Sequence, residues 1–222
     1  MSKRHHIIDN DNLANKRFGL IYTKKCGWID LGHAYPDSAS KLWESILNER
    51  SQHNDSSSQN NFTVEYSQSM GSKKYNANTF VGKSKKFEIQ KGLSLDIKKS
   101  IALSIVLKVS LEFETMQSNW FYSLITDSGF SSEDLISNII GVYRAIYPTI
   151  NFLEICQPVS KSESTYIWDK FGAVGALKNR TLSPYLYPLQ DEPTTYPRKS
   201  VLPAILNTIK PTQEGSYFNE VR

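Results

Sequence analysis

His33 and Asp30 are the residues whose types and spacing best suit acid–base or metal chemistry. His33 follows the apolar run 28–31 directly after Gly32, and Asp30 should face the same side of that strand as Gly32, close to the imidazole. A histidine at the end of a strand can serve as a general base or as a metal ligand, and a nearby carboxylate orients its ring. The plainer alternative is a half-buried histidine that bonds a main-chain carbonyl, because no HExxH-type partner accompanies it.

Glu112 places a carboxylate on the apolar side of a long helical segment. It falls on the same helical row as Ile101 and Ile105, and desolvation there would favour the neutral acid and suit it to proton transfer. Lys108, four residues earlier, offers the alternative of an ion pair within the helix.

Asp134 and Asn138 lie at the start of a second helical segment, one turn apart. A purely structural explanation is also available, because acidic residues such as Glu133 and Asp134 stabilise the first turn of a helix through capping and the helix dipole. Asn138 occupies an inward position and needs hydrogen-bond partners. A cluster of His33, Glu112, Asp134 and Asn138 across a cleft could bind a divalent cation or catalyse acid–base hydrolysis. The cofactor stays open, with a divalent metal ion as the candidate.

Cys26 requires a histidine base if it is to act as a nucleophile. His33 is close in sequence, but strand geometry carries the two apart unless the bend at 24–27 folds back. A cysteine hydrolase is therefore less favoured than a carboxylate-based one. With Cys156 far away in sequence and no CxxC, two free thiols are favoured over one disulfide.

The composition excludes several classes of function. The 222 residues, 39% of them hydrophobic, suffice for one large domain. The net charge of +4 comes from interspersed basic and acidic residues, so we expect no specific binding of nucleic acid. No G-x-S-x-G, P-loop or G-x-G-x-x-G pattern supports a serine hydrolase, a nucleotide hydrolase or a dinucleotide enzyme.

The N-terminal residues lack the apolar run of a secretory signal, and no stretch reaches the roughly 18 apolar residues that span a bilayer. We expect a protein that is cytoplasmic as synthesised, without a transmembrane segment, and export without a cleaved signal peptide stays open. The sequence does not indicate an oligomeric state.

Apolar periodicity predicts strands before Gly92 and helices after it. Alternation at 18–23, 28–31, 62–70 and 79–89 predicts one small antiparallel sheet, with bends at 24–27 and 82–86. Helical spacing predicts a helix at 39–50, a buried helix pair at 93–117 and 135–146, and a short helix at 164–171. Residues 150–156 suit either a strand or a helical turn.

The predicted fold class is α+β, with the small antiparallel sheet packed against the buried helix pair. Residues 1–16 should form a flexible N-terminal arm, and residues 17–222 a single globular domain. Within that domain, the polar stretch 51–61 predicts a mobile loop. The prolines and tyrosines of 179–222 predict an extended, irregular C-terminal wrap.

Three short motifs resemble those of a bacterial family of unknown function, many of whose members are envelope lipoproteins. They are G-L-I-Y-T at 19–23, G-W-I-D-L-G-H at 27–33 and G-F-S-S-E-D-L-I-S-N-I-I-G at 129–141, against family patterns G-F-I-D-x-x-H and S-F-S-x-E-D-x-x-S-N-x-x-G. The likeness spans the first and central thirds of the chain, not the tail from Pro158. It implies that one site contains Asp30, His33, Glu133, Asp134 and Asn138, and it brings no established activity.

The chain departs from this family in two ways. It has no lipoprotein signal, and Leu107 and Lys108 stand where the resemblance leads us to expect a His-Glu pair on the long helix. The second departure weakens the case for a metal.

The function expected from these features is that of a hydrolase-like protein, an exported effector or toxin acting on an envelope component such as peptidoglycan. His33 would be the base or a ligand and Glu112 or Asp134 the acid, with Asp30 beside them and Glu133, Asn138 and Cys26 in binding roles. The alternative is a non-enzymatic binding or immunity-type protein with a cognate protein partner, in which the polar cluster is only a buried hydrogen-bond network.

Overall fold

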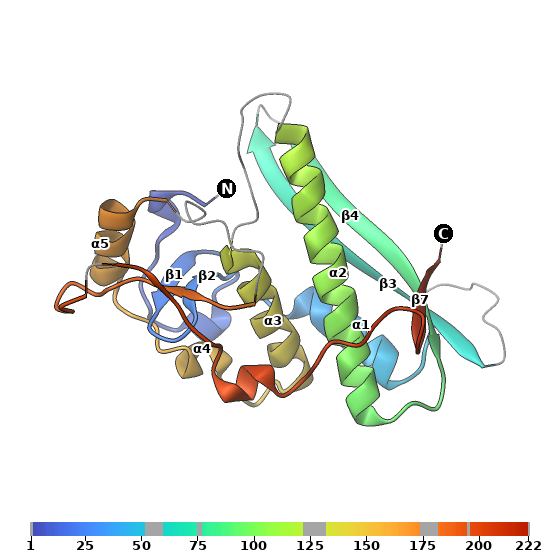
Figure 1. The fold of residues 1–222 in the computed structure, drawn as a ribbon. Coiled ribbons are helices and arrows are strands. Elements are labelled where there is room, and N and C mark those ends of the chain that lie inside the picture. Colours follow the sequence, from blue (N-terminus) through green and yellow to red (C-terminus); the bar gives the residue numbers. More distant parts are fainter. Residues whose placement is uncertain are drawn as a thin grey trace. The chain divides into compact units, whose positions relative to one another are not determined.

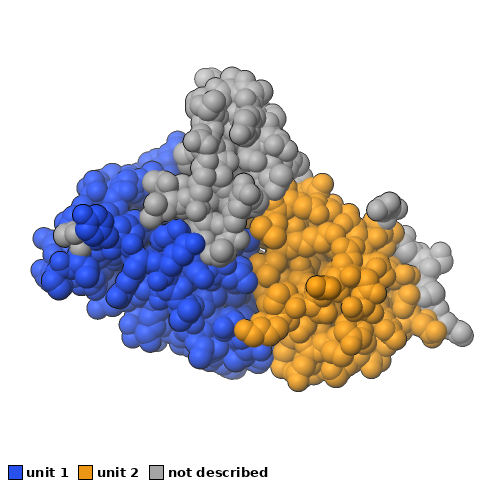
Figure 2. All heavy atoms as spheres, viewed as in Figure 1, with its two compact units in different colours: residues 1–36, 118–208 blue, residues 37–117, 209–222 orange. Residues whose placement is uncertain are grey.

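The computed structural model describes residues 2–51, 60–74, 77–121, 132–173, 182–194 and 196–221. Helices combine with small antiparallel sheets, so the predicted α+β class is confirmed (Figure 1). The contacts divide the chain into two compact units: unit 1 comprises residues 1–36 and 118–208, and unit 2 comprises residues 37–117 and 209–222 (Figure 2). A single globular domain over 17–222 stays a prediction.

Unit 1 contains the hairpin of β1 (Leu20–Thr23) and β2 (Gly27–Asp30), which pair antiparallel from Leu20 and Asp30 to Thr23 and Gly27. The hairpin predicted at 18–31 is thereby confirmed. Gly27 has a φ of +68°, and a Cβ there would lie 2.4 Å from the main-chain oxygen of Tyr185. Only glycine allows both the bend and this close approach.

Helices and short strands surround this hairpin in unit 1. They are η1 (Arg4–His6), η2 (Leu13–Asn15), α3 (Ser132–Ile146), α4 (Phe152–Ile155), α5 (Lys161–Phe171), β5 (Tyr185–Leu186), β6 (Arg198–Lys199) and η3 (Ala204–Asn207). Strands β5 and β6 form a two-stranded antiparallel sheet of their own. The open choice at 150–156 is resolved as the helical turn α4, and the short helix predicted at 164–171 is α5.

The core of unit 1 joins segments that are far apart in sequence. One cluster of this core comprises the buried residues Ile7, Leu20, Tyr22, Trp28, Val159 and Ile167. The Trp28 ring packs edge-on against Tyr22 at 5.3 Å and against Trp168 at 6.0 Å between ring centroids. Aromatic pairs in this arrangement add to the stabilisation that burial of their area supplies.

The N-terminal residues pack onto unit 1, which the prediction of a flexible arm over 1–16 did not anticipate. Ile7 is 2% exposed and forms a parallel bridge with Leu20, and Leu13 is also buried. The Arg4 guanidinium binds the Asp169 carboxylate through two hydrogen bonds of 2.7 Å. The burial of Ile7 and Leu13 helps to anchor this stretch, because each side chain gains by leaving water.

Unit 2 contains a three-stranded antiparallel sheet of order β3-β4-β7, with β3 at Asn61–Lys74, β4 at Ala77–Gln90 and β7 at Phe218–Val221. Helix α1 (Asp37–Leu47) buries Leu42, Trp43 and Ile46 as its periodicity predicts, whereas Leu47 is exposed. Helix α2 (Leu95–Phe121) starts after Ser94, whose Oγ accepts a hydrogen bond from the Ile97 amide at 3.4 Å. Ser94 is thus the N-cap of α2.

Three details of the predicted architecture differ from the structure. The hairpin β1–β2 and the strands β3 and β4 belong to separate sheets, because alternation fixes which face of a strand is apolar but not its partner. The bend expected at 82–86 lies inside β4, where its lysines form ion pairs instead of a turn. Helix α2 as far as Gln117 belongs to unit 2 and α3 to unit 1, so packing of the two as a pair stays a prediction.

Two other predictions, for residues 51–61 and 179–222, can be compared with the structure only in part or differ from it in part. Most of the mobile loop expected at 51–61 lies outside the described residues. The C-terminal segment predicted to be extended over 179–222 contains β5, β6 and β7, and also the 3-10 turn η3.

Candidate functional site

Asp30 ends β2, and a tight turn fixes its side chain. The Gly32 amide donates to Asp30 Oδ1 at 2.7 Å, and the Ala34 amide donates to the Asp30 carbonyl at 2.9 Å. An aspartate that bonds the main chain two residues ahead is a common way to begin a turn. This turn carries His33 back beside Asp30, so the two residues predicted to be neighbours are neighbours.

The turn packs against helix α3 along a stripe of small and polar residues. Ser137 Oγ accepts a hydrogen bond from the Asp30 amide at 3.0 Å. A Cβ on Gly141 would lie 2.9 Å from the His33 carbonyl oxygen, so only a glycine lets the turn approach this closely. Arg144 donates to the Ala34 carbonyl at 2.8 Å. These positions are three or four residues apart and share one helix face.

Arg144 also ties the N-terminal segment to the turn. Its second terminal nitrogen donates to the Ala14 carbonyl at 3.0 Å, and Tyr35 lies between Arg144 and Arg17, with the Arg17 guanidinium 4.8 Å from the centre of the Tyr35 ring. Burial lowers the pKa of Arg144, against the attraction of Tyr35. An arginine keeps its charge despite such a shift, so it holds two main-chain carbonyls in place as a cation.

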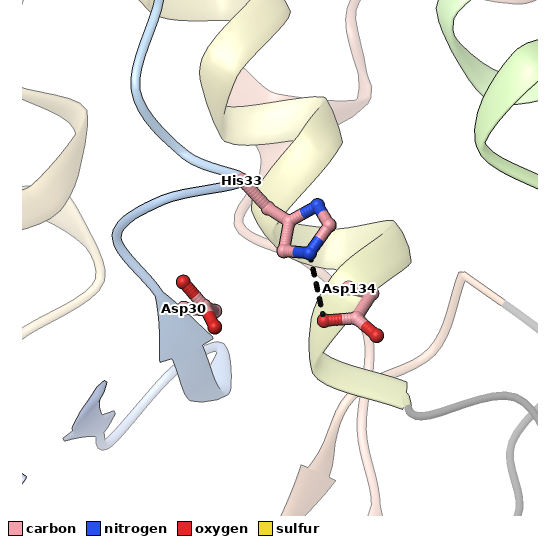
Figure 3. Close-up of side chains that lie close together, drawn as sticks. All are labelled: Asp30, His33 and Asp134. Atoms are coloured by element: carbon pink, nitrogen blue, oxygen red, sulfur yellow. Dashed lines mark ion pairs between the residues drawn. The ribbon is translucent and has the colours of Figure 1, made fainter. Parts of the chain in front are cut away.

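The turn and the first turn of α3 bring Asp30, His33 and Asp134 together (Figure 3). His33 Nε2 lies 3.5 Å from Asp134 Oδ1, and one ligand atom from each of the three side chains lies within 4.8 Å of the others. The side chains of His33 and Asp134 are 17% and 14% exposed. The cluster is therefore largely shielded from water while keeping some access to it.

One nitrogen and two carboxylate oxygens are a donor set that fits a divalent metal ion. Imidazole nitrogen suits zinc and other late transition metals, and carboxylate oxygen suits manganese as well as zinc. Three protein ligands leave a coordination position for water, as in catalytic zinc sites. Without a metal, the same arrangement is a histidine oriented by a carboxylate, which is the geometry of a general base.

Asn138 and Glu133 flank Asp134 on α3. Asn138 is buried one turn further along the helix, which agrees with its predicted inward position. The side chain of Glu133 lies outside the described part of the structure. His6, which the sequence placed in a flexible arm, lies close enough to Asp30 to feel its charge. Burial and the charge of His5 lower the pKa of His6, and the charge of Asp30 acts in the opposite direction.

Glu112 lies in unit 2 and the cluster in unit 1, so its place in the cluster stays a prediction. Its carboxylate accepts a hydrogen bond from Lys85 Nζ at 2.6 Å, and Lys83 Nζ is 3.8 Å away. The alternative partner Lys108 instead binds Glu214 and Glu220. The reason is that β4 and β7 place charges beside α2, which helix periodicity alone cannot reveal.

Cys26 does not border His33 in a catalytic arrangement. It is 1% exposed, and its Sγ lies 2.8 Å from Sγ of Cys156. The interpretation of Cys26 as a binding residue of the cluster finds no contact to support it among the described residues. A cavity of unit 1, lined among others by Tyr22, Tyr187 and Arg198, likewise contains none of the three clustered residues.

Comparisons with known proteins add the following findings. A family model described as a protein of unknown function (DUF4056) matches residues 2–156, a range that contains Asp30, His33 and Asp134. The comparison with curated proteins and the comparison with solved structures each gave no match. In the described part of the chain, none of the helices is both long and apolar enough to cross a membrane.

Proposed function

The chain belongs to the DUF4056 family of proteins of unknown function, and from this premise we propose that it is a hydrolase whose Asp30, His33 and Asp134 hold a divalent metal ion. The observation that carries the proposal is the convergence of one imidazole and two carboxylates within 4.8 Å. Asp134 is more than 100 positions from Asp30 and His33 in the chain, so chain proximity alone does not explain their meeting.

The support around the cluster also favours a functional site. Ser137, Gly141 and Arg144 hold the turn against α3, and the Gly32 amide holds Asp30 Oδ1. Outer contacts of this kind orient ligands and are typically as important as the ligands themselves, with losses of about 10- to 100-fold in metal affinity when they are removed. These four contacts hold the turn and the Asp30 side chain in place, which supports the proposal of a preformed metal site.

The chemistry follows from the donor set. A metal ion held by three protein ligands lowers the pKa of its bound water to about 7 and supplies a hydroxide nucleophile at neutral pH. In that arrangement Asp30 and Asp134 would hold the metal as anionic ligands, and His33 would bind it as the neutral ring. If the same function needs no metal, His33 is the general base. Asp134 then orients its ring, with Asp134 Oδ1 3.5 Å from His33 Nε2.

The proposed substrate is a component of the bacterial envelope such as peptidoglycan, and the protein would be an exported effector or toxin. The support is the likeness of the segments 27–33 and 129–141 to a bacterial family with many envelope lipoproteins. Synthesis in the cytoplasm and export without a cleaved signal peptide belong to the same proposal.

A second candidate function is a binding or immunity-type protein with a cognate protein partner. It is favoured by the low exposure of His33 and Asp134, since a structural hydrogen-bond network tolerates burial better than a substrate site does. In that case His33→Ala should cost about 1–3 kcal/mol of stability, because a buried partner is left unsatisfied. At a cleft-lining ligand position, the same change should leave the melting temperature nearly unaltered.

The test is metal titration by calorimetry, with Zn²⁺ and Mn²⁺ as separate probes, on the wild type and on Asp134→Asn. Asparagine keeps the shape of the side chain but removes the anionic ligand, so we expect affinity to fall by more than about 100-fold, beyond the loss typical of an outer contact. Glu112→Gln is the matched control: it makes the same change in unit 2 and should leave the titration unchanged.

Hydrolysis is then measured on purified peptidoglycan. Toxicity is measured by expressing the wild type and His33→Ala in the cytoplasm and, with an added export signal, in the periplasm. We expect damage only from the exported wild type. Equal metal binding by the wild type and Asp134→Asn would refute the metal site, and equal harmlessness of all versions would refute the toxin.

A further inference from the structure

Cys26 and Cys156 are a pair of buried thiols in contact, although 130 residues separate them in the sequence. Their Sγ atoms lie 2.8 Å apart, and the residues are 1% and 0% exposed. Cys26 lies in the bend between β1 and β2, and Cys156 follows the last residue of α4. Both belong to unit 1.

Main-chain hydrogen bonds hold the two segments side by side without help from sulfur. The Lys24 amide donates to the Gln157 carbonyl at 2.9 Å, and the Lys25 amide donates to the Cys156 carbonyl at 3.1 Å. Thr23 and Pro158 form an antiparallel bridge beside them. Because the backbone is already in place, a bond between the sulfurs requires little movement.

The surroundings of the pair do not suit a cysteine nucleophile. Contact with the Cys26 thiol and burial both raise the pKa of Cys156, so little thiolate exists at neutral pH in the folded protein. Reactive cysteines are partly exposed and have a lowered pKa. The pair is therefore better suited to a structural bond than to catalysis.

We propose that Cys26 and Cys156 are an oxidation site, which a disulfide oxidant such as glutathione disulfide converts into a structural disulfide. One thiol, as its thiolate, attacks a sulfur of the oxidant, forming a mixed disulfide and releasing one molecule of reduced glutathione. The thiolate of the other cysteine then attacks the protein sulfur of that mixed disulfide and releases a second reduced glutathione. The protein loses two protons and two electrons, and the oxidant gains them.

Burial determines when this reaction occurs. In the folded protein an oxidant cannot reach either sulfur, so the bond forms during folding or through a local opening of the bend and the end of α4. Once formed, the bond is protected in the same way against reductants. It links the hairpin that ends in Asp30 to α4 by a covalent bond.

The experiment compares wild-type protein unfolded and refolded in glutathione disulfide with protein refolded in dithiothreitol. Each sample is alkylated in denaturant and its intact mass is measured. We expect no alkyl group after refolding with the oxidant and alkylation of both cysteines after refolding with the reductant. The oxidised form should melt about 5–15 °C higher, as a cross-link over a long loop does in a chain of this size.

Cys26→Ser and Cys156→Ser are the matched controls. Each retains one thiol and cannot form the internal bond, so refolding with glutathione disulfide should not raise its melting temperature above that after refolding with dithiothreitol. Alkylation of both cysteines in monomeric wild type refolded with the oxidant would overturn the proposal. So would a disulfide that links two chains instead of these two residues, which non-reducing electrophoresis detects.

Discussion

Asp30 has two separable roles at the scale of the single residue. Its Oδ1 accepts the Gly32 amide and so forms the turn, and its carboxylate belongs to the three-residue cluster. The first role needs only an oxygen acceptor, whereas the second needs a negative charge for metal binding. Different substitutions of one residue can therefore separate the turn from the site.

We predict that Asp30→Asn keeps the stability of the wild type and loses metal affinity, whereas Asp30→Ala loses metal affinity and is also less stable. Asparagine keeps the acceptor for Gly32, so its thermal midpoint should stay close to that of the wild type. Alanine leaves the amide without its acceptor, at a cost of about 1 kcal/mol. Thermal unfolding and Zn²⁺ calorimetry on the same two variants provide the measurements. Equal destabilisation by both would show that the charge, and not the hydrogen bond, holds the turn.

The sequence predicted some residues of the site and not others, for physical reasons. Asp30 and His33 are close in the chain, so strand alternation and one turn were enough to place them together. Ser137 and Arg144 act on main-chain atoms of a distant segment, and nothing in their own neighbourhood indicates this. The apolar row that Glu112 interrupts gave no sign of Lys85 on β4, which donates a hydrogen bond to its carboxylate.

At the scale of the elements, Gly141 determines how closely α3 and the His33 turn approach each other. Its Cβ, if present, would lie 2.9 Å from the His33 carbonyl oxygen, a main-chain atom that cannot move independently. Helix propensity alone favours alanine over glycine by about 1 kcal/mol in a helix interior. The local and the tertiary effects of Gly141→Ala therefore have opposite signs.

We predict that Gly141→Ala destabilises the protein by about 1–3 kcal/mol, the usual cost of overpacking, and weakens metal binding by displacing His33. Chemical denaturation and Zn²⁺ calorimetry measure the two effects. A stabilised variant with unchanged affinity would mean that the turn yields at no cost and that the glycine has no positioning role.

Strand β7 joins unit 2 through charges as well as through its pairing with β4. The Glu220 carboxylate lies 2.7 Å from Lys85 Nζ on β4 and 2.9 Å from Lys108 Nζ on α2. Hydrogen bonds from Lys85 and then Lys108 lower the pKa of Glu220 from its ordinary 4.5, and Lys108 lowers that of Glu214. A carboxyl group whose pKa is lower in the folded state contributes stability above its unfolded value.

We predict that the stabilisation from Glu220 is complete at neutral pH and is lost as the pH falls below about 4.5 through the lower folded pKa. Glu220→Gln should lower the free energy of unfolding at pH 7 by no more than the roughly 1 kcal/mol of a solvent-screened pair. The thermal midpoint should fall accordingly, and the difference from the wild type should vanish in acid. Glu88→Gln makes the same change on β4 outside this network and is the matched control. A constant difference across the pH range would exclude the charge as its source.

At the scale of the whole molecule, the family match and the folded core have different extents. The match ends at residue 156, whereas the core of unit 1 includes Val159 and Ile167. The Val159 amide donates to the Tyr22 carbonyl at 3.0 Å, and the Tyr22 hydroxyl donates to the Tyr187 carbonyl at 3.0 Å. The later segments thus cover the hairpin that carries Asp30. Sequence reasoning found α5 but not this role, because the partners of an apolar face are set by tertiary contacts.

We predict that a chain ending at residue 156 does not fold cooperatively, although it contains Asp30, His33 and Asp134. Burying a large apolar side chain contributes about 1.5–3 kcal/mol, so losing the Val159, Ile167 and Trp168 contacts removes an amount comparable with the roughly 5–15 kcal/mol that stabilises a domain. The truncated chain should bind a hydrophobic dye and lack a sharp thermal transition. A chain ending at residue 208 is the control, since it keeps every member of this core and should retain the near-ultraviolet circular dichroism of the Trp28–Trp168 pair. A sharp transition in the shorter chain, close to that of the full protein, would show that the matched region carries its own core.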